Sequence, residues 1–225
     1  MTPDSQFWWN WGVQAAVAVG TAGAALAALF GEWVRDKLRK PPLLRVALRS
    51  ELGDRTMLRL PDYSRSAAGA LFEYPARYYH LRVTNERRAS PADDVQVFLL
   101  RVEEFGSDLA WRIVWNGEVL LRWRNWEVSP LTRRIGTAAD CDLCHVVKGR
   151  GFFLEPVLAP NNLRTKHEQA NLILTLQAKS VQADSPIVRV AVKWDSWWED
   201  DDAGMAKHLT VRIIEPSAND KARAD

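Results

Sequence analysis

The chain has 225 residues, of which 26% are charged, yet its formal net charge is only +2. This balance gives no electrostatic reason to bind a polyanion, so no nucleic acid partner is expected. Two cysteines are too few for a disulfide scaffold. The part that follows the N-terminal segment is long enough to form one domain with a full hydrophobic core.

The N-terminal feature is an uncharged apolar segment, residues 11–30, which reads WGVQAAVAVGTAGAALAALF. At about 1.5 Å per residue, a helix of this length spans the ~30 Å hydrocarbon core of a bilayer. Tryptophans flank it at positions 8, 9, 11 and 33, where aromatic belts form. Residues 1–42 are therefore predicted to be a transmembrane anchor with a basic juxtamembrane segment. The alternatives are a soluble helix and a cleaved signal peptide, which needs basic residues that positions 1–10 lack.

The distribution of basic residues predicts the orientation of this anchor. None precedes the apolar segment, whereas six follow it closely: Arg35, Lys37, Arg39, Lys40, Arg45 and Arg49. The positive-inside rule then places the N-terminus outside and everything from Gly31 onward in the cytoplasm. The same basic run is expected to attract anionic lipid headgroups of the bilayer.

Small residues recur along the apolar segment at helical spacing. They are Gly12, Ala16, Gly20, Gly23, Ala27 and Gly31. Faces of this kind let helix backbones approach closely in lipid, so the pattern favours a homo-oligomer formed through the transmembrane helix. The alternative is that alanine and glycine are simply common in this segment.

Period-two alternation of apolar and polar residues dominates after Pro42. Short runs occur at 44–48, 79–84, 95–99, 111–115, 119–123, 172–176, 188–192 and 209–213. Antiparallel strands with one wet face produce this pattern, and eight or nine of them indicate a sandwich or a small barrel. We therefore predict a mainly β domain over residues 43–216, with a short helix near residues 161–169. The small, charged tail 217–225 is predicted to be disordered.

One segment resembles a known architecture. Residues 79–85, YHLRVTN, and residues 92–97, ADDVQV, resemble the hairpin of Ig-like domains, of the general form LxVxN…AxxVxV. The layout of one tryptophan-flanked span followed by such a domain resembles uncharacterised bacterial single-pass membrane proteins with a C-terminal Ig-like β-sandwich. This resemblance implies an antiparallel sandwich fold and a bacterial inner-membrane setting, and it supplies no activity and no catalytic residues.

The sharpest chemical motif is Cys141-Asp142-Leu143-Cys144-His145. This C-x-x-C-H spacing is the attachment pattern of c-type haem, and it also suits a zinc site or a redox-active thiol pair. Haem attachment is extracytoplasmic, which conflicts with the predicted topology, and zinc would need a fourth ligand. We therefore expect no cofactor and treat the thiols as structural. A second haem ligand could come from five residues: His80, His167, His208, Met57 and Met205.

Two further stretches are candidate sites. Tryptophans and arginines alternate between residues 111 and 126, where Arg beside aromatic rings could hold a nucleotide or a phosphorylated ligand; a sandwich core with a charged outer face gives the same pattern. The candidates are Trp111, Arg112, Arg122, Trp123, Arg124 and Trp126. Four carboxylates at 199–202 could hold calcium, but they lack EF-hand spacing and read better as a solvated loop.

Known catalytic fingerprints are absent from the sequence: it contains no P-loop, no Gly-x-Ser-x-Gly and no dinucleotide-binding motif. The prediction is therefore a non-enzymatic, membrane-anchored binding or sensor module with a protein partner. A ligand-responsive membrane effector of the kind found in bacterial defence is the alternative, followed by an electron-transfer protein that uses Cys141, Cys144 and His145.

Overall fold

The structure, a computed structural model, divides into two compact units, residues 1–40 and 41–225. It describes residues 40–62, 70–124 and 131–214, together with residues 11, 14, 16–17, 19–21, 23–24 and 30–31 of the N-terminal unit. The transmembrane prediction for residues 11–30 therefore falls partly outside the described residues, and the predicted tail 217–225 lies wholly outside them.

The described residues of the N-terminal unit are helical, apart from Lys40 at its end. The hydroxyl of Thr21 donates a hydrogen bond to the carbonyl of Val17, one turn earlier, at 2.8 Å. No helix within the described part of the chain is both long and apolar enough to cross a bilayer. Ala16, Gly20, Gly23 and Gly31 of the proposed small-residue face are in this helix, while Gly12 and Ala27 lie outside the described residues. Helix pairing stays a prediction.

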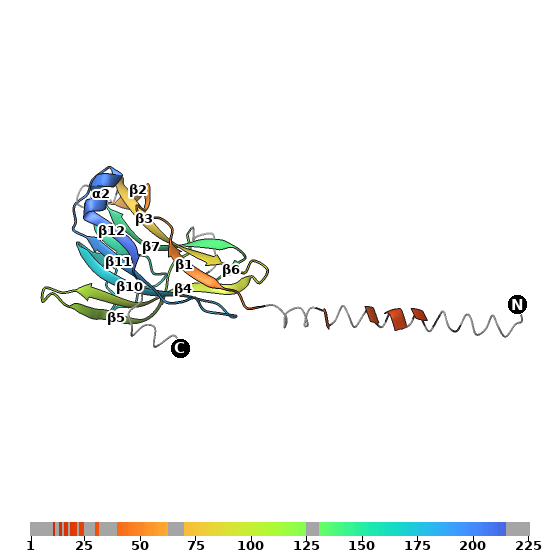
Figure 1. The fold of residues 1–225 in the computed structure, drawn as a ribbon. Coiled ribbons are helices and arrows are strands. Elements are labelled where there is room, and N and C mark those ends of the chain that lie inside the picture. Colours follow the sequence, from red (N-terminus) through yellow and green to blue (C-terminus); the bar gives the residue numbers. More distant parts are fainter. Residues whose placement is uncertain are drawn as a thin grey trace, which may run out of the picture. The chain divides into compact units, whose positions relative to one another are not determined.

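The second unit is mainly β and consists of two antiparallel sheets (Figure 1). The first sheet has the order β1-β3-β7-β8-β9, with β2 also paired to β3. The second has the order β12-β11-β10-β4-β5, with β6 also paired to β4. The strands of the first sheet are β1 (Leu44–Leu48), β2 (Asp54–Pro61), β3 (Leu71–Asn85), β7 (Ala138–Val147), β8 (Gly151–Leu154) and β9 (Lys166–His167). Those of the second are β4 (Ala92–Phe105), β5 (Trp111–Leu120), β6 (Arg133–Ile135), β10 (Ala170–Lys179), β11 (Val188–Trp194) and β12 (Leu209–Ile214).

The hydrophobic core forms between the two sheets, as the alternation predicts. Leu81 and Val83 of the first sheet and Val97 and Leu99 of the second are fully buried in one cluster. Successive side chains of a strand point to opposite faces, so the residues between them face outward. The mainly β fold and the antiparallel sandwich-like arrangement predicted from the sequence are confirmed.

The hairpin predicted from residues 79–97 is wrong. β3 pairs with β1, β2 and β7, whereas β4 pairs with β5, β6 and β10, so the two strands belong to different sheets. The chain between them crosses from one sheet to the other. Both strands have inward-facing residues at alternate positions, and this pattern is the same whether two strands pair with each other or face each other across a core.

The buried side chain of Asn85 holds this crossing in place. Its Oδ1 accepts hydrogen bonds from the backbone N–H groups of Leu43, at 3.2 Å, and Arg87, at 3.0 Å. Its Nδ2 donates to the carbonyls of Ser90, at 2.8 Å, and Ile135, at 3.3 Å. One side chain thus ties together the chain before β1, the crossing itself and β6.

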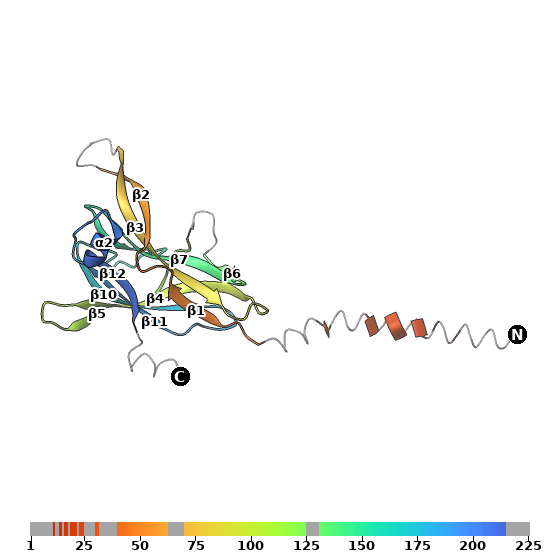
Figure 2. The same cartoon turned by 45° about the horizontal axis from the view of Figure 1, so that its top comes forward.

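Two other local predictions differ from the structure. No helix forms at residues 161–169; the segment instead contains a turn and the short strand β9. A short helix, α2 (Asp202–His208), forms where the sequence suggested a loop, and the side chain of Asp201 caps it by accepting from the N–H of Gly204 at 2.8 Å. The β2–β3 hairpin projects from the first sheet beyond its pairing with β7 (Figure 2).

Candidate functional site

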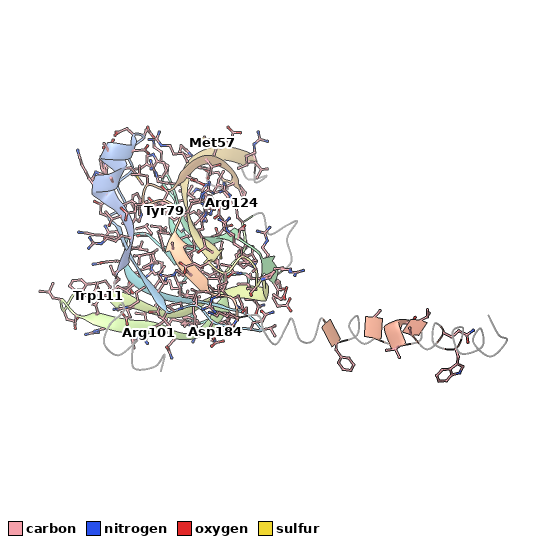
Figure 3. All side chains as sticks on the ribbon, turned by 45° about the vertical axis from the view of Figure 1, so that its right-hand side comes forward. Met57, Tyr79, Arg101, Trp111, Arg124 and Asp184 are labelled. Atoms are coloured by element: carbon pink, nitrogen blue, oxygen red, sulfur yellow. The ribbon has the colours of Figure 1, made fainter. Side chains whose placement is uncertain are left out.

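The described tryptophans and arginines between residues 111 and 124 do not form one site. Trp111 and Arg112 lie at the end of the β4–β5 hairpin, and Trp123 is buried in the core. Leu121 and Trp123 form bridges to Pro156 and Cys141, so the chain leaves the second sheet after β5 and joins the first. Arg122 and Arg124 therefore contact the first sheet, and Figure 3 shows Arg124 far from Trp111. Trp126 lies outside the described residues.

The end of the β4–β5 hairpin is a compact, internally bonded turn. The N–H of Gly106 donates to the carbonyl of Ala110 at 2.9 Å, and the N–H of Leu109 donates to the carbonyl of Gly106 at 3.1 Å. The guanidinium of Arg112 donates to the carboxylate of Asp108 at 2.6 Å. In Figures 1 and 2 the hairpin extends beyond the neighbouring strands of its sheet.

Apolar side chains are exposed along this hairpin. The exposed fraction is 80% for Leu109, 44% for Trp111, 61% for Ile113 and 47% for Val114. The ring of Trp111 packs edge-on against Phe105 of the paired strand, with 5.3 Å between ring centroids. Contiguous exposed apolar groups on a soluble domain commonly mark an interaction surface.

A β-bulge explains why the sequence pattern misplaced Ile113. Alternation predicts that Trp111, Ile113 and Trp115 share the inward face. In the structure Ile113 lies opposite Glu103 while Trp115 lies opposite the next residue back, Val102, so Val114 is an extra residue. The extra residue reverses the faces on either side of it. Trp115 is consequently buried, and Ile113 points outward beside Trp111.

β5 is also the last strand of its sheet. Within the described ranges it pairs with β4 alone, which leaves the backbone N–H and C=O groups along its other side without a strand partner. An edge strand of this kind can accept an extended segment of another chain. Beside it, on the outward face, Glu103 lies between Arg101, at 3.2 Å, and Arg189, at 2.6 Å, in a mostly buried ion-pair cluster.

The outward face of the first sheet carries a row of stacked rings. Tyr78, His145, Phe153 and Lys166 lie opposite one another on β3, β7, β8 and β9. The ring centroids of Tyr78 and His145 are 4.6 Å apart, and those of His145 and Phe153 are 5.0 Å apart. Burial is the main reason that the pKa of Tyr78 rises to about 12, and the nearby carboxylates of Glu155 and Asp142 add to it.

Two histidines on this face are held by carboxylates. Nδ1 of His80 lies 2.7 Å from Asp142, and its Nε2 lies 3.4 Å from Asp54. Nδ1 of His145 lies 2.5 Å from Glu155. A surface pocket of about 270 Å³ adjoins His80, but its lining mixes Asp54 and Asp142 with Arg55 and Arg124. Because both ring nitrogens of His80 face carboxylates, this imidazole serves to bridge β2 and β7.

The two cysteines of the C-x-x-C-H motif are separated from its histidine. In a regular strand, residues three apart point to opposite faces, but Leu143 is an extra residue between the pairs His80–Asp142 and Tyr79–Cys144. Cys141 and Cys144 therefore both lie in the core and are fully buried, whereas His145 stacks on the outward face. Covalent attachment of haem requires accessible thiols, and these thiols are enclosed by apolar side chains.

The five candidate partners for a haem or metal are dispersed. His80 is bonded to Asp142, and His208 lies 2.8 Å from Asp195. Met205 is the buried residue of α2, and Met57 is exposed on β2. His167 is buried, its Nε2 donates to the carbonyl of Arg164 at 3.1 Å, and burial lowers its pKa. Across the ranges that the structure describes, no three His, Cys, Asp or Glu side chains come together as a metal site.

The acidic residues 199–202 bind other groups of the protein and do not converge on one point where a metal ion could sit. Asp200 accepts from Trp198 and from Lys148, at 2.8 and 3.1 Å. Asp201 caps α2, and Asp202 accepts from Arg55 and the buried Arg77, at 2.7 and 2.8 Å. These contacts anchor α2 to β2, β3 and the β7–β8 turn, which accounts for the charges without calcium.

The two thiols are expected to respond differently to substitution by serine. The thiol of Cys141 donates to the carbonyl of Arg122 at 3.2 Å, so a serine hydroxyl at this position has an acceptor. No such acceptor is found for Cys144 among the described residues. Cys144→Ser should therefore lower the free energy of unfolding by about 1–2 kcal/mol more than Cys141→Ser, because a buried hydroxyl without a partner is costly.

Urea denaturation of the purified chain, followed by tryptophan fluorescence, measures this difference. Cys144→Ala and Cys141→Ala are the matched controls, since they remove the sulfur without adding a hydroxyl. Equal losses of stability for the two serine variants would contradict the assigned environments.

Comparison with known proteins identifies no relatives of this chain. No protein-family model matches it, and no curated protein and no solved structure matches it either.

Proposed function

We propose that this protein is a membrane-anchored binding module whose β-sandwich docks a protein partner through the β4–β5 hairpin. The observation that carries the proposal is the exposure of Leu109, Trp111, Ile113 and Val114 together along a strand that ends its sheet. Natural edge strands usually carry charges or prolines that discourage pairing. Apart from Arg112, which is already bonded to Asp108, this end of β5 is apolar.

The mode of docking follows from the chemistry of an edge strand. An extended segment of the partner would add to β5 through backbone hydrogen bonds, which supply affinity but little discrimination. Trp111 and Ile113 would supply specificity by contacting alternate side chains of the added segment. Aromatic anchors of this kind contribute a large share of the binding energy in protein interfaces.

The membrane anchor in this proposal rests on the sequence. The apolar segment 11–30, its flanking tryptophans and the basic residues 35–40 support a single-pass helix with its N-terminus outside and the sandwich in the cytoplasm. The resemblance to bacterial membrane proteins supports an inner-membrane location. In this arrangement the sandwich acts as a sensor or adaptor held close to anionic headgroups.

Replacing Ile113 by lysine is expected to reduce capture of the partner at least about tenfold. The lysine removes apolar contact area and places a charge on the docking edge, the device by which natural edge strands avoid pairing. The measurement is quantitative mass spectrometry of proteins that co-purify with the full-length chain from native membranes. Because Ile113 is 61% exposed, the substitution should leave the stability of the sandwich nearly unchanged.

Leu158→Lys is the matched control. Leu158 is an exposed leucine outside the hairpin, with an exposed fraction of 81%, so the same change in charge there should leave capture intact. A set of co-purifying proteins that survives Ile113→Lys, or that is lost equally with both variants, would overturn the assignment of the hairpin as the docking site.

A further inference from the structure

Residues from β3, from β7 and from the chain between β5 and β7 converge on one surface pocket. The pocket has a volume of about 280 Å³ and is lined by Arg82, Arg124, Arg133, Ala138, Ala139 and Asp140. Arg82 comes from β3, Arg133 from β6 and Arg124 from the segment that follows β5, while β7 supplies the two alanines and the aspartate. We call it the arginine pocket.

Positive charge exceeds negative charge around this pocket. Asp140 lies 2.9 Å from Arg82, 3.1 Å from Arg49 and 4.0 Å from Arg124, so three guanidinium groups share one carboxylate. Burial opposes the ionisation of Asp140, but Arg82 and Arg49 outweigh burial and lower its pKa. The next carboxylate, Asp54, is shared in the same way between Arg49, at 3.4 Å, and Arg124, at 3.3 Å.

Arg124 is the arginine whose guanidinium can donate hydrogen bonds to a bound anion. Its distances to Asp54 and Asp140, 3.3 and 4.0 Å, exceed the usual length of a charge-assisted hydrogen bond. Its side chain is 37% exposed. A guanidinium carries five N–H donors in a planar fork, so Arg124 can engage a second anion while it remains near these carboxylates.

The other walls of the pocket suit a compact anion. Arg133 lies over the ring of Trp123, with 5.8 Å between its Cζ and the ring centroid, and this contact orients its head group. Ala138 and Ala139 have short side chains, so the space between the arginines stays open. Asp140 fixes Arg82 through two hydrogen bonds to its Nε and Nη2.

We propose that the arginine pocket binds a phosphate group, with Arg82, Arg124 and Arg133 as its cationic walls. The fork of guanidinium donors matches phosphate oxygens two at a time, which lysines would not. The lining of the pocket carries three guanidinium groups, those of Arg82, Arg124 and Arg133, and one carboxylate, that of Asp140. The phosphate could belong to a soluble small molecule or to a lipid headgroup, since both present the same chemistry.

The test uses the full-length chain in detergent and isothermal titration calorimetry with three probes. Glycerol 3-phosphate represents a soluble phosphomonoester, short-chain phosphatidic acid represents a lipid phosphomonoester, and glycerol lacks the phosphate. The diagnostic variant is Arg124→Gln, with Arg133→Gln as a second. The matched control is Arg134→Gln, because Arg134 is exposed beside Arg133 and pairs with Asp93, at 3.1 Å, rather than lining the pocket.

We expect a phosphate probe to bind and glycerol not to bind. The affinity for the phosphate probe should be about tenfold weaker in Arg124→Gln and in Arg133→Gln, and unchanged in Arg134→Gln. Tighter binding of glycerol 3-phosphate than of phosphatidic acid indicates a soluble ligand, and tighter binding of phosphatidic acid indicates a headgroup. Two results would overturn the proposal. One is that neither phosphate probe binds, and the other is that Arg134→Gln weakens binding as much as Arg124→Gln, which would mean that surface charge alone attracts the probe. The pocket is distinct from the β4–β5 hairpin, so this result stands apart from the test of partner docking.

Discussion

Replacing Asn85 by alanine should lower the free energy of unfolding by about 2–4 kcal/mol. The asparagine side chain is buried and makes four hydrogen bonds, to Leu43, Arg87, Ser90 and Ile135. Alanine removes all four and leaves two N–H groups and two carbonyls short of a partner where the chain crosses between the sheets. Because these groups belong to segments before β1, after β3 and in β6, the loss should loosen one end of the sandwich.

Urea denaturation of the full-length chain gives the change in free energy directly. Asn162→Ala is the matched control, because Asn162 lies in an exposed turn and should cost less than about 0.5 kcal/mol. Asn85→Asp is a second informative variant: its oxygen can still accept from Leu43 and Arg87, but it cannot donate to Ser90 and Ile135. A stability for Asn85→Ala equal to that of the wild type would show that this side chain does not hold the crossing.

Raising the pH from about 8 to about 10 should destabilise the folded chain by about 3 kcal/mol through its two thiols. Burial raises the pKa of Cys141 and of Cys144 well above the ordinary value of 9.0, and nearby carboxylates add to the effect. In the unfolded chain both thiols ionise as the pH passes 9.0, whereas in the folded chain they stay protonated. Their contribution to stability is therefore complete below pH 9 and is lost as the pH rises beyond it, by about 1.4 kcal/mol per thiol and pH unit.

The tyrosines extend this loss to higher pH. The pKa of Tyr78 is raised to about 12, chiefly by burial, and burial likewise raises that of Tyr79. Because the pKa of each tyrosine is raised, its contribution to the free energy of unfolding is also lost as the pH rises above the ordinary tyrosine value of 10.0.

The variant that isolates the thiols is Cys141→Ala with Cys144→Ala. Its stability at neutral pH will be lower because two core sulfurs are lost, but between pH 8 and 10 its unfolding free energy should decline much less steeply than that of the wild type. Urea denaturation at a series of pH values measures both slopes under reducing conditions. Parallel slopes for the two proteins would mean that the thiols do not remain protonated in the folded chain.

Local patterns predicted most strands but not their partners. The runs at 44–48, 172–176, 188–192 and 209–213 all lie in strands of the structure, because apolar residues at every second position need only a core on one side. The long strands at 54–61 and 138–147 were missed, as were the short strands β6, β8 and β9. β2 is largely exposed on both faces, and β7 carries the bulge at Leu143, so neither shows a clean alternation.

For the candidate sites, too, the sequence predicted individual residues but not which of them lie together. Arg124 was predicted as a ligand-binding residue because it is close in sequence to tryptophans. Of these, Trp111 lies on the hairpin, and Trp123 is buried in the core, where it packs against Arg133 rather than presenting its ring to a ligand. No sequence signal links Arg124 to Arg82 and Arg133, which come from other strands and meet it only in the folded chain. The sequence did not predict the exposure of Ile113 either, because the alternation of its strand places this residue on the core-facing side.

The sequence by itself determined the class of the domain, a mainly β fold with an apolar inner face on each strand, because burial imposes a period of two within each strand. It also carries the N-terminal apolar segment on which the proposed membrane anchor rests. Only the tertiary structure decided that β3 and β4 lie in different sheets, that Cys141 and Cys144 share the core while His145 does not, and that three arginines line one pocket. The physical reason is that strand pairing is long-range and a single extra residue reverses a face, so neither can be read from the local alternation.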